Sequence, residues 1–363
     1  MGRPREARTR TEDDVPRLTL ATVAVGVPMG QQVYEREVSA RAERALGPDV
    51  TVRRSVTRSL RSPLPGTARL PYWVLRDAPA GVRRAVGAAL YPRADVVHRM
   101  GLSLPPARVP EIVTVHDTVA WRFPDESPPE PFAAQETRRA RAVISVSRFA
   151  ADDVAERLGL DHVHVVHNGV DDRFFDARPL TPEQRRGLGV DGPYVLHAGG
   201  SSLRKNLDGL AAAWPAVRSA HPDVTLVLSG PPSERRDRLF GPLEGARRVG
   251  LVPDALVPGL VAGASAVVVP SLYEGFGLPA LEAMAVGVPV VAAERSSLPE
   301  VCGDAGILVE PDGAGLADGL VHALGGGTDV RERTERGLAR ARRFTWDASA
   351  AAHAVVWREV LAG

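Results

Sequence analysis

Lys205 is the only lysine in this chain, and the other 44 basic residues are all arginine. It follows Arg204 in the turn "GGSSLRKNL", which begins with Gly199 and Gly200 after an apolar run. Glycines let backbone amides approach a ligand, and the start of a helix presents free N–H groups to an anion. A lysine adds a compact, mobile point charge where arginine would add a planar fork. These are the requirements of a diphosphate site, although a surface turn with two solvated cations fits the stretch equally well.

Two glutamates with seven residues between them stand in "PSLYEGFGLPALEAM". Glu274 lies in a turn that ends at Gly277, and Pro279 suits the first turn of a helix. Glu282 then falls about one turn into that helix, so both carboxylates can face a ligand that crosses the end of the preceding strand. Carboxylates accept hydrogen bonds in pairs, which suits vicinal sugar hydroxyls. A loop Glu and a helix Glu paired with arginines would be the plainer interpretation, but it leaves the glycines, the proline and the aromatic residue unexplained.

Three histidines, His162, His164 and His167, are predicted on one strand. A metal site there is the weaker interpretation, because no cysteine or third ligand on the same face supports it. The aspartates in "VDDRFF" are typical of a linker turn. Asp117, directly after His116, is either a site residue or the cap of a turn, and we favour the site.

The elements that must position these residues alternate along the chain. Continuous Val, Ile and Leu strands separated by helices predict parallel sheets that are covered on both faces. Strands are expected at 18–26, 49–56, 94–100, 111–117, 142–147 and 162–170, and again at 194–199, 224–230, 247–252, 265–271, 289–294 and 306–310. Helices are expected over 31–46, over 148–159 with Ser147 as its cap, and from near Asn206, Asp254, Leu278, Leu298 and Gly313. Two such blocks indicate two Rossmann-like domains, and the cleft between them is the expected site.

Composition narrows the class of protein. With 363 residues, 44% apolar and 25% charged, the chain has the profile of a two-domain globular protein. The net charge of +1 gives no general attraction to nucleic acid or to an anionic membrane, although local basic patches stay open. The basic stretch 331–344 is interleaved with Glu332 and Glu335, which indicates a solvated helix face rather than a nucleic-acid groove.

Cys302 is the only cysteine, so no intrachain disulfide can form, and a reducing, cytoplasmic location is expected. The first 16 residues contain no apolar stretch and are expected to be a disordered tail. The longest apolar region is interrupted by Glu282 and two prolines, so no transmembrane segment is predicted. Peripheral membrane association stays open.

Several segments of the chain resemble those of a known family. "EGFGLPALE", with the later "GVPVVAA" and "LPEVCGDAGILVEPDG", resembles the retaining nucleotide-sugar glycosyltransferases of family four, which have the GT-B fold. Further segments are similar in the expected order: "VTVHDT", "VISVSRFAADDV", "VVHNGVD", "GGSSLRKN" and "FTWDASAAAHAVVWREVL". The resemblance therefore covers nearly the whole chain after the tail.

The resemblance implies an α/β architecture with two Rossmann-like domains that face a central cleft. The acceptor-side domain would span 17–172, after the tail at 1–16, and the nucleotide-sugar domain would span 173–345. The last segment, 346–363, would be a helix that crosses back onto the first domain. The Gly-, Pro- and Asp-rich stretch 168–192 holds the boundary.

The resemblance also implies roles for individual residues. Arg204 and Lys205 would hold the donor diphosphate and stabilise the leaving nucleotide, next to the Gly199–Gly200 turn. Glu274 would contact hydroxyls of the donor sugar, and Glu282 would bind the ribose. Backbone amides would contact the sugar and the distal phosphate; these belong to Gly275, Phe276, Gly277 and Leu278.

On the opposite side of the cleft, His116 would face the reacting sugar, and Gly30 and Asp117 would lie on the acceptor side. The loop "VGVPMGQQVYERE" departs from the family, because Gln31 and Gln32 follow Gly30 where a double glycine is usual. The acceptor class is therefore open.

The activity implied is transfer of a sugar, with retained anomeric configuration, from a nucleoside-diphosphate sugar to an acceptor hydroxyl. His116, Glu274, Arg204 and Lys205 would be catalytic, with no metal and no cofactor beyond the co-substrate. The sugar is open between mannose, glucose and N-acetylglucosamine, and the acceptor between a glycan and a secondary metabolite. A pyridoxal-phosphate phosphorylase is disfavoured because the single lysine is already placed in the phosphate turn. A non-catalytic subunit that binds nucleotide sugar is the remaining alternative.

Overall fold

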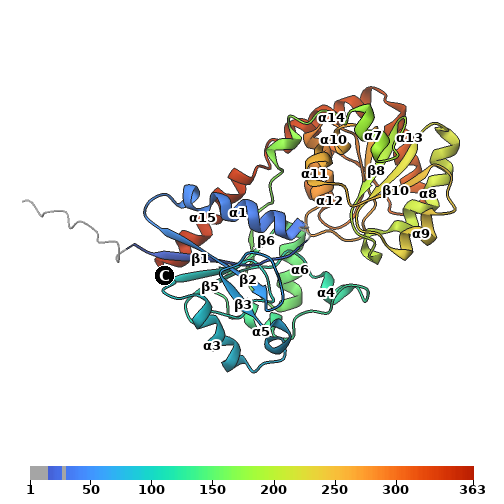
Figure 1. Cartoon of the computed structure of the whole chain (residues 1–363). Helices are drawn as coiled ribbons and strands as arrows, with labels where there is room; N and C mark the ends of the chain where they lie inside the picture. The colour runs from blue at the N-terminus through green and yellow to red at the C-terminus, as the bar shows by residue number, and fades with distance from the viewer. Residues whose placement is uncertain (1–14, 27–29) are drawn as a thin grey trace, which may run out of the picture.

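Two parallel sheets organise the chain, and the computed structural model describes residues 15–26 and 30–363 (Figure 1). Most of the predicted tail, up to residue 14, lies outside the described residues. The first sheet has the order β3-β2-β1-β4-β5-β6-β7 and the second β10-β9-β8-β11-β12-β13. All of the described strand pairs are parallel. The predicted fold class, two Rossmann-like domains, is confirmed.

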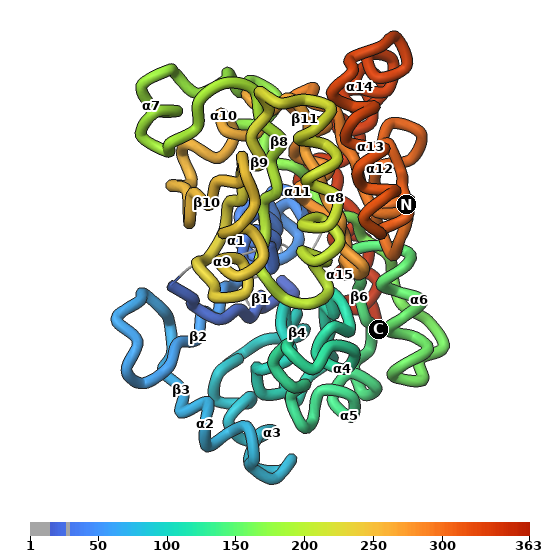
Figure 2. The backbone as a smooth tube through the Cα atoms, turned by 90° about the vertical axis from the view of Figure 1, so that its right-hand side faces the viewer, coloured from blue at the N-terminus to red at the C-terminus, as the bar shows by residue number. Residues whose placement is uncertain are grey.

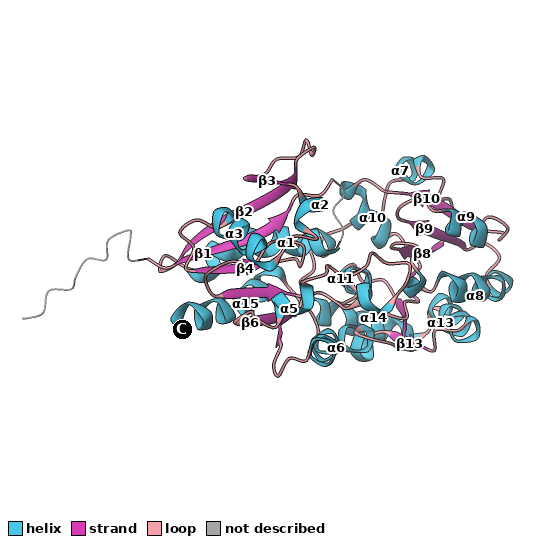
Figure 3. Cartoon of the chain, turned by 90° about the horizontal axis from the view of Figure 1, so that it is seen from below, coloured by secondary structure: helices cyan, strands magenta, loops and turns pink. Residues whose placement is uncertain are grey.

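The first domain carries helices on both faces of its sheet (Figure 3). Its strands are β1 (Arg17–Val23), β2 (Thr51–Ser59), β3 (Ala68–Leu70), β4 (Val96–Arg99), β5 (Glu111–Thr114), β6 (Ala142–Ser145) and β7 (His164–Val165). Its helices are α1 (Gly30–Leu46), α2 (Tyr72–Leu75), α3 (Ala80–Leu90), α4 (Val119–Arg122), α5 (Ala133–Thr137) and α6 (Arg148–Leu158). Ser147 caps α6 as predicted, because its Oγ accepts from the Ala150 amide at 3.0 Å.

The second domain repeats the layered arrangement. Its strands are β8 (Tyr194–Ala198), β9 (Thr225–Ser229), β10 (Ala246–Gly250), β11 (Ala266–Val269), β12 (Val290–Ala293) and β13 (Ile307–Val309). Its helices are α7 (Pro182–Gly187), α8 (Leu207–Ala220), α9 (Glu234–Phe240), α10 (Val257–Ala262), α11 (Leu278–Ala285), α12 (Leu298–Cys302), α13 (Gly313–Gly325) and α14 (Thr328–Ala341). Short 3₁₀ turns lie at Asp172–Phe174, Leu203–Lys205, Asp254–Leu256 and Gly303–Ala305.

The last helix, α15 (Trp346–Ala362), crosses back and packs along α1 of the first domain, as predicted (Figures 1 and 2). It completes a buried chain of hydrogen bonds. Trp357 Nε1 donates to His98 Nδ1 at 3.0 Å, and His98 Nε2 lies 2.8 Å from Thr114 Oγ1. Tyr34 Oη lies 2.8 Å from Thr114 Oγ1 and 2.7 Å from His353 Nε2. A buried network of this kind specifies one packing, because a slipped helix would leave its members unpaired.

The chain passes between the domains twice, and the two crossings touch. The Val170 amide donates to the Phe344 carbonyl at 2.9 Å, and a Cβ on Gly169 would lie 2.2 Å from the Trp346 nitrogen. Only glycine therefore permits this close approach.

One predicted strand is wrong in extent. Only His164–Val165 of the stretch 162–170 pairs with β6. The residues after β7 leave the sheet because His167 turns to Glu300, at 2.7 Å, and Val170 joins the second crossing. The elements between residues 60 and 93 and between 118 and 141 were not predicted at all, because β3, α2, α4 and α5 have only three to five residues each and α3 follows no long apolar period.

Candidate active site

Glu274, Arg204 and Lys205 form a largely buried ionic cluster where the loops after β8 and β11 meet. Lys205 Nζ lies 2.6 Å from Glu274 Oε1, which also accepts from Ser271 Oγ at 2.7 Å. Arg204 Nη1 lies 3.2 Å from Glu274 Oε2. Burial opposes ionisation, but Lys205 and Arg204 outweigh it and lower the pKa of Glu274. The three residues predicted as catalytic in this domain are thus in direct contact as ions.

The turn that carries the cations is anchored by a residue that sequence reasoning missed. Arg236, from α9, donates from Nη2 to the carbonyls of Gly199, Gly200 and Ser229. The Gly199 amide is itself bonded to the Ser229 carbonyl at 3.1 Å, so this amide is not free in the structure. The space beside Gly200 is empty, as a ligand-facing glycine requires.

The helix predicted to begin near Asn206 is confirmed. Lys205 is in the 3₁₀ turn Leu203–Lys205, and α8 begins at Leu207. Asn206 takes a left-handed conformation, with φ of 52°, and its side chain accepts from the Gly209 amide at 3.2 Å. The cations therefore precede the helix rather than lying in its first turn.

His197 lies close to the cation turn and was also missed. The residue is 2% exposed, and neither ring nitrogen has a hydrogen-bond partner among the described residues. Burial, then Arg236 and Lys205, lower its pKa to about 3, so the ring is neutral at neutral pH.

The loop 274–278 leaves three of its backbone amides unpaired among the described residues. Ser297 Oγ donates to the carbonyls of Glu274 and Phe276 at 2.9 and 2.8 Å, which fixes the loop from below. The amides of Gly275, Phe276 and Gly277 have no acceptor among the described residues. Gly277 has φ of +103° and precedes α11. Three free N–H groups at a helix start form a ready anion or hydroxyl site.

The two domains contact each other at Gly275. A Cβ there would lie 2.4 Å from the His116 carbonyl oxygen and 3.2 Å from Asp117 Cβ, so the glycine is required by close packing across the cleft. Ser147 Oγ, in the first domain, donates to the Gly275 carbonyl at 2.6 Å. The structure therefore brings His116 and Asp117 against the loop 274–278.

His116 itself is a neutral ring at this contact. Its centroid lies 4.7 Å from that of Tyr34, edge to face. Burial lowers its pKa to about 4, against a hydrogen bond with the Met100 carbonyl. Nε2 has no partner among the described residues, so it is available as an acceptor.

The acceptor-side candidates lie near the same contact. Asp117 Oδ1 accepts from the Val119 amide at 3.2 Å, so it caps a turn; burial raises its pKa, while Arg204 opposes the shift. Gly30 begins α1, and a Cβ there would lie 3.5 Å from Leu278 Cδ1. The unusual Gln31 donates to Glu35 Oε1 at 2.9 Å. Residues 27–29 of this loop lie outside the described residues.

Glu282 does not join the ionic cluster. Its carboxylate has no hydrogen bond within the described part of the chain. Burial, followed by the charges of Asp171 and Asp254, raises its pKa to about 7, while Arg173 opposes the shift. The aspartate pair behaves as predicted for a linker turn, because Asp171 accepts from the Arg173 amide at 2.9 Å.

A loop of the first domain that was not predicted reaches Arg204. Arg204 Nε lies 2.8 Å from Glu126 Oε1, and the Leu203 amide donates to Asp125 Oδ2 at 2.6 Å. Neither acidic residue stands in a recognisable motif, so only the fold could reveal them.

Comparison with known proteins shows which family has this sequence and fold. Residues 29–174 match the model of glycosyltransferase family 4, and residues 192–325 match that of the glycosyl transferases group 1. O-antigen chain mannosyltransferase B of Escherichia coli is 32% identical over 274 residues, which cover 69% of this chain and 71% of the relative. The chain belongs to glycosyltransferase family 4.

Other known proteins are similar to this family 4 chain over a smaller share of their own length or at lower sequence identity. D-inositol 3-phosphate glycosyltransferase of Jonesia denitrificans is 32% identical over 67% of this chain and 64% of the relative. Among solved structures, sucrose-phosphate synthase from Thermosynechococcus elongatus aligns with a TM-score of 0.74 at 21% identity, covering 96% of this chain and 99% of that one. Anabaena HepE, solved with UDP-glucose, aligns with 0.71 at 20%, covering 94% and 99%. These likenesses show the GT-B fold.

Within residues 15–26 and 30–363, no group of three or more His, Cys, Asp or Glu side chains is placed to hold a metal ion. No helix in the same ranges has the length and apolar character needed to cross a bilayer.

Proposed function

We propose that this family 4 glycosyltransferase moves a hexosyl group from a nucleoside-diphosphate sugar to an acceptor hydroxyl with retained configuration. The observation that carries the proposal is the Glu274–Lys205–Arg204 cluster beside the free amides of Gly275 to Gly277. Mannosyl, glucosyl and N-acetylglucosaminyl groups all suit a site of this chemistry, and the mannosyltransferase among the relatives makes mannosyl the first to test.

In this proposal the donor exchanges partners with Glu274. The diphosphate takes Arg204 and Lys205, which frees the Glu274 carboxylate to accept from sugar hydroxyls. The neutral His116 ring accepts a further sugar hydroxyl at Nε2. The leaving phosphate accepts the proton of the attacking acceptor on the same face of the sugar. Catalysis then consists mainly of positioning and of stabilising charge on the leaving group.

The two glutamates provide the test. Glu282→Ala should weaken both free nucleoside diphosphate and intact donor, since a lost charge-assisted hydrogen bond is worth roughly 1.5–3 kcal/mol, or about 10- to 150-fold. Its thermal stability should stay level or rise, because the carboxylate has no partner in the ligand-free protein. Glu274→Ala should spare nucleotide affinity, since it removes an anion that competes for the cations, while turnover falls.

Calorimetry of nucleotide and donor, together with turnover, separates these outcomes. Equal loss of nucleotide affinity in both variants contradicts the proposed division of roles. If the glutamates were merely structural, both variants would lose stability without distinguishing ligands. Donor binding without any transfer would favour a non-catalytic subunit, an alternative that no feature of the site supports.

We also propose that transfer needs no divalent metal, because the two cations of the cluster meet the charge of the diphosphate that a metal would otherwise meet. Transfer activity should persist after exhaustive chelation and dialysis. Loss of activity that a divalent ion restores would contradict this part of the proposal.

The charge of residues 50–93 indicates what kind of surface could present the acceptor. Residues 50–93 contain nine arginines and one aspartate, a formal charge of +8 against +1 for the whole chain. Four large apolar side chains of this segment are exposed: Leu60 at 50%, Trp73 at 78%, Val74 at 45% and Val82 at 49%. The elements concerned pack together through Leu70, Leu75 and Val86. Basic and apolar groups in one unit fit an anionic lipid surface, so we propose peripheral membrane association there.

A further inference from the structure

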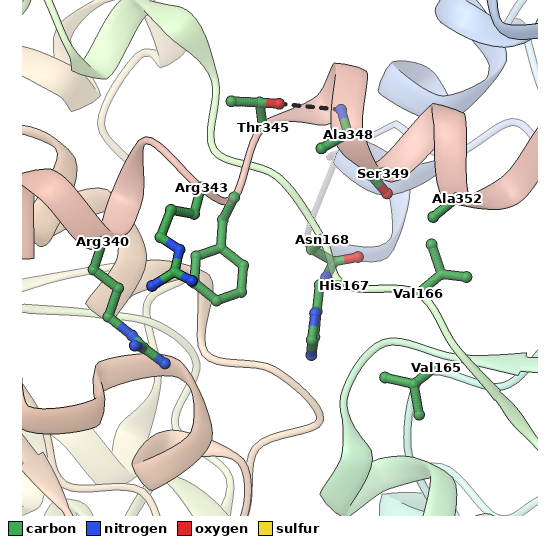
Figure 4. Close-up of a pocket in the computed structure, with 11 residues that line it drawn as sticks. Val165, Val166, His167, Asn168, Arg340, Arg343, Thr345, Ala348, Ser349 and Ala352 are labelled. Carbon is green, nitrogen blue, oxygen red and sulfur yellow. Dashed lines mark hydrogen bonds between the residues drawn. The ribbon is translucent and has the colours of Figure 1, made fainter.

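A pocket of about 360 Å³ lies where the chain crosses between the domains (Figure 4). The crossing segment after β7 contributes His167 and Asn168, and the segment around the start of α15 contributes Arg343 and Ser349. No residue of the ionic cluster or of the loop 274–278 lines it, so it is separate from the donor site. Its volume is within the range of about 300–1,000 Å³ that is typical of sites for small organic molecules.

Two buried polar groups in this pocket have no partner. Asn168 is 5% exposed and its Oδ1 accepts from no described residue, and Ser349 is 4% exposed and its Oγ is likewise unpaired. A buried polar atom without a partner costs free energy, and native proteins pair nearly all of them. One group comes from each crossing segment, so an occupant with hydroxyl groups could satisfy both at once.

The charge of the lining is positive. The Arg343 guanidinium has no partner among the described residues, Arg340 lies near it, and the lining includes no Asp or Glu. In Figure 4 the two guanidinium groups lie on one side of His167 and Asn168, while Val166, Ser349 and Ala352 lie on the other. A ligand would therefore meet cations at one end and apolar and hydroxyl groups at the other.

We infer that this pocket binds a small organic anion that carries hydroxyl groups, either a phosphate monoester or a hydroxy acid, as an effector of the enzyme. The anion pairs with Arg343, and the hydroxyl groups bond to Asn168 and Ser349. The inference goes beyond the transfer reaction, and its binding step does not depend on that reaction.

The pocket is connected to the donor loop by direct contacts. Arg340, at its edge, donates to the carbonyls of Glu300 and Val301 at 2.7 Å each, and His167 bonds the Glu300 carboxylate. That carboxylate also accepts from the Arg148 amide at the start of α6, in the first domain, at 2.9 Å. An occupant that moves His167 or Arg340 therefore acts on the contact between the domains.

The same helix, α12, is also connected to the loop 274–278. Ser297, the residue before α12, holds the Glu274 and Phe276 carbonyls. The donor and the effector thus bias one shared element, which is the physical condition for coupling two sites, and the coupling must be reciprocal.

Binding is tested first, on the full chain, with glycerol 3-phosphate, hexose 6-phosphates, citrate and inorganic phosphate as probes. At least one organic probe should bind saturably by calorimetry. Arg343→Gln should weaken it about tenfold or more, as expected for a lost charge-assisted bond, and Ser349→Ala by about two- to tenfold. Arg342→Gln removes the same charge from an exposed neighbour that does not line the pocket, and should leave affinity unchanged.

Three outcomes would overturn the inference. These are no saturable binding of any organic probe at 10 mM or below, on the order of the weakest specific affinities; equal losses in Arg342→Gln and Arg343→Gln; or displacement of the probe by saturating nucleoside diphosphate, which would place it in the donor site. The two arginine variants are expected to fold normally, because neither side chain has a partner to lose.

The effector role is tested by repeating the nucleoside-diphosphate titration with and without saturating probe. We expect donor-site affinity to change severalfold in the wild type and not in Arg343→Gln. Probe binding without any change in nucleotide affinity would refute the effector role. Because these readouts need no turnover, failure of the proposed transfer reaction would be seen separately, in the activity assay alone.

Discussion

At the scale of single residues, Glu274 and Glu282 show how neighbours decide what a carboxylate can do. Glu274 is surrounded by donors, so the pKa of its carboxyl is lowered despite burial. Glu282 is eight positions later, has no donor and faces Asp171 and Asp254, so its pKa rises to about 7. One carboxylate is stabilised as an ion by its neighbours, and the other has no donor among the described residues.

The raised pKa of Glu282 predicts pH-dependent binding. Ribose hydroxyls donate to the ionised carboxylate, so nucleoside-diphosphate affinity should increase as pH rises through about 7. Glu282→Gln should lack this step while keeping the titration of the diphosphate itself. Asp254→Asn removes one of the charges that raise the pKa, so the midpoint should move to lower pH. Calorimetric titrations between pH 5.5 and 8.5, about 1.5 units on either side of the pKa, provide the measurement. An identical pH profile in wild type and Glu282→Gln would refute the assignment.

The pH dependence of folding stability has the opposite sign to that of nucleotide binding. A carboxyl whose pKa is higher in the folded than in the unfolded protein favours folding at low pH, and this contribution is lost as pH rises from the unfolded value through about 7. Glu282→Gln should therefore flatten the ligand-free stability profile over this interval.

Lys205 gives the second prediction at this scale. Its side chain is 11% exposed, and its ammonium lies 2.6 Å from Glu274 and within 4 Å of the space beside Gly199. Lys205→Ala should weaken nucleoside-diphosphate binding by roughly tenfold or more, the worth of a charge-assisted bond, and leave nucleoside binding nearly unchanged. Lys205→Arg should also lose turnover, because a planar fork does not fit the space of a point charge.

The two ligands, titrated against wild type and both variants, decide this assignment. Equal loss for diphosphate and nucleoside would remove Lys205 from the phosphate site. Full activity of Lys205→Arg would mean that the single lysine is an accident of composition.

At the scale of elements, the predictions succeeded where one local rule governs the structure. α11 begins at Leu278 and α12 at Leu298 as expected, since a glycine or serine followed by proline defines each start. The segment 60–93 could not be predicted, because β3 and α2 are short and depend on packing around Leu70 and Leu75.

The candidate site was likewise predictable only where its residues stand in a local motif. The charged pair at 204–205 and both glutamates stand in motifs, whereas Arg236 is one of 44 arginines and no spacing distinguishes it. Its role depends on where α9 lies below the Gly199 turn. Ser297 and Glu126 are likewise defined by tertiary contacts and by no local pattern.

The basic unit formed by β2, β3, α2 and α3 gives a prediction at this scale. The protein should sediment with vesicles that contain a substantial share of anionic lipid and not with neutral ones, and binding should fall as salt rises. Trp73→Ala combined with Arg76→Gln should reduce binding several-fold. Arg331→Gln combined with Arg336→Gln, on α14, is the control for charge. Equal effects of the two double variants, or equal binding to neutral vesicles, would contradict docking through this unit.

At the scale of the whole molecule, the domains are joined by more than the two crossings. The Ser147–Gly275 and Arg148–Glu300 hydrogen bonds connect the start of α6 to the loop 274–278 and to helix α12. Tyr273, next to Glu274, also donates to Asp153 of the first domain at 2.6 Å. The candidate site therefore depends on the relative position of the domains, and a change in that position would alter the site without altering either sheet.

The return of α15 has a consequence for how the protein reaches this structure. Tyr34 and His353 are hydrogen-bonded although 319 positions separate them. The core of the first domain therefore closes only after the whole second domain has been synthesised, and a loop of this length must be brought together late in folding. Until then the core cluster around Tyr34 and Val38 of α1 lacks the side chains that α15 contributes, among them Trp346 and Trp357. The first domain, although made first, is therefore the last to complete its core.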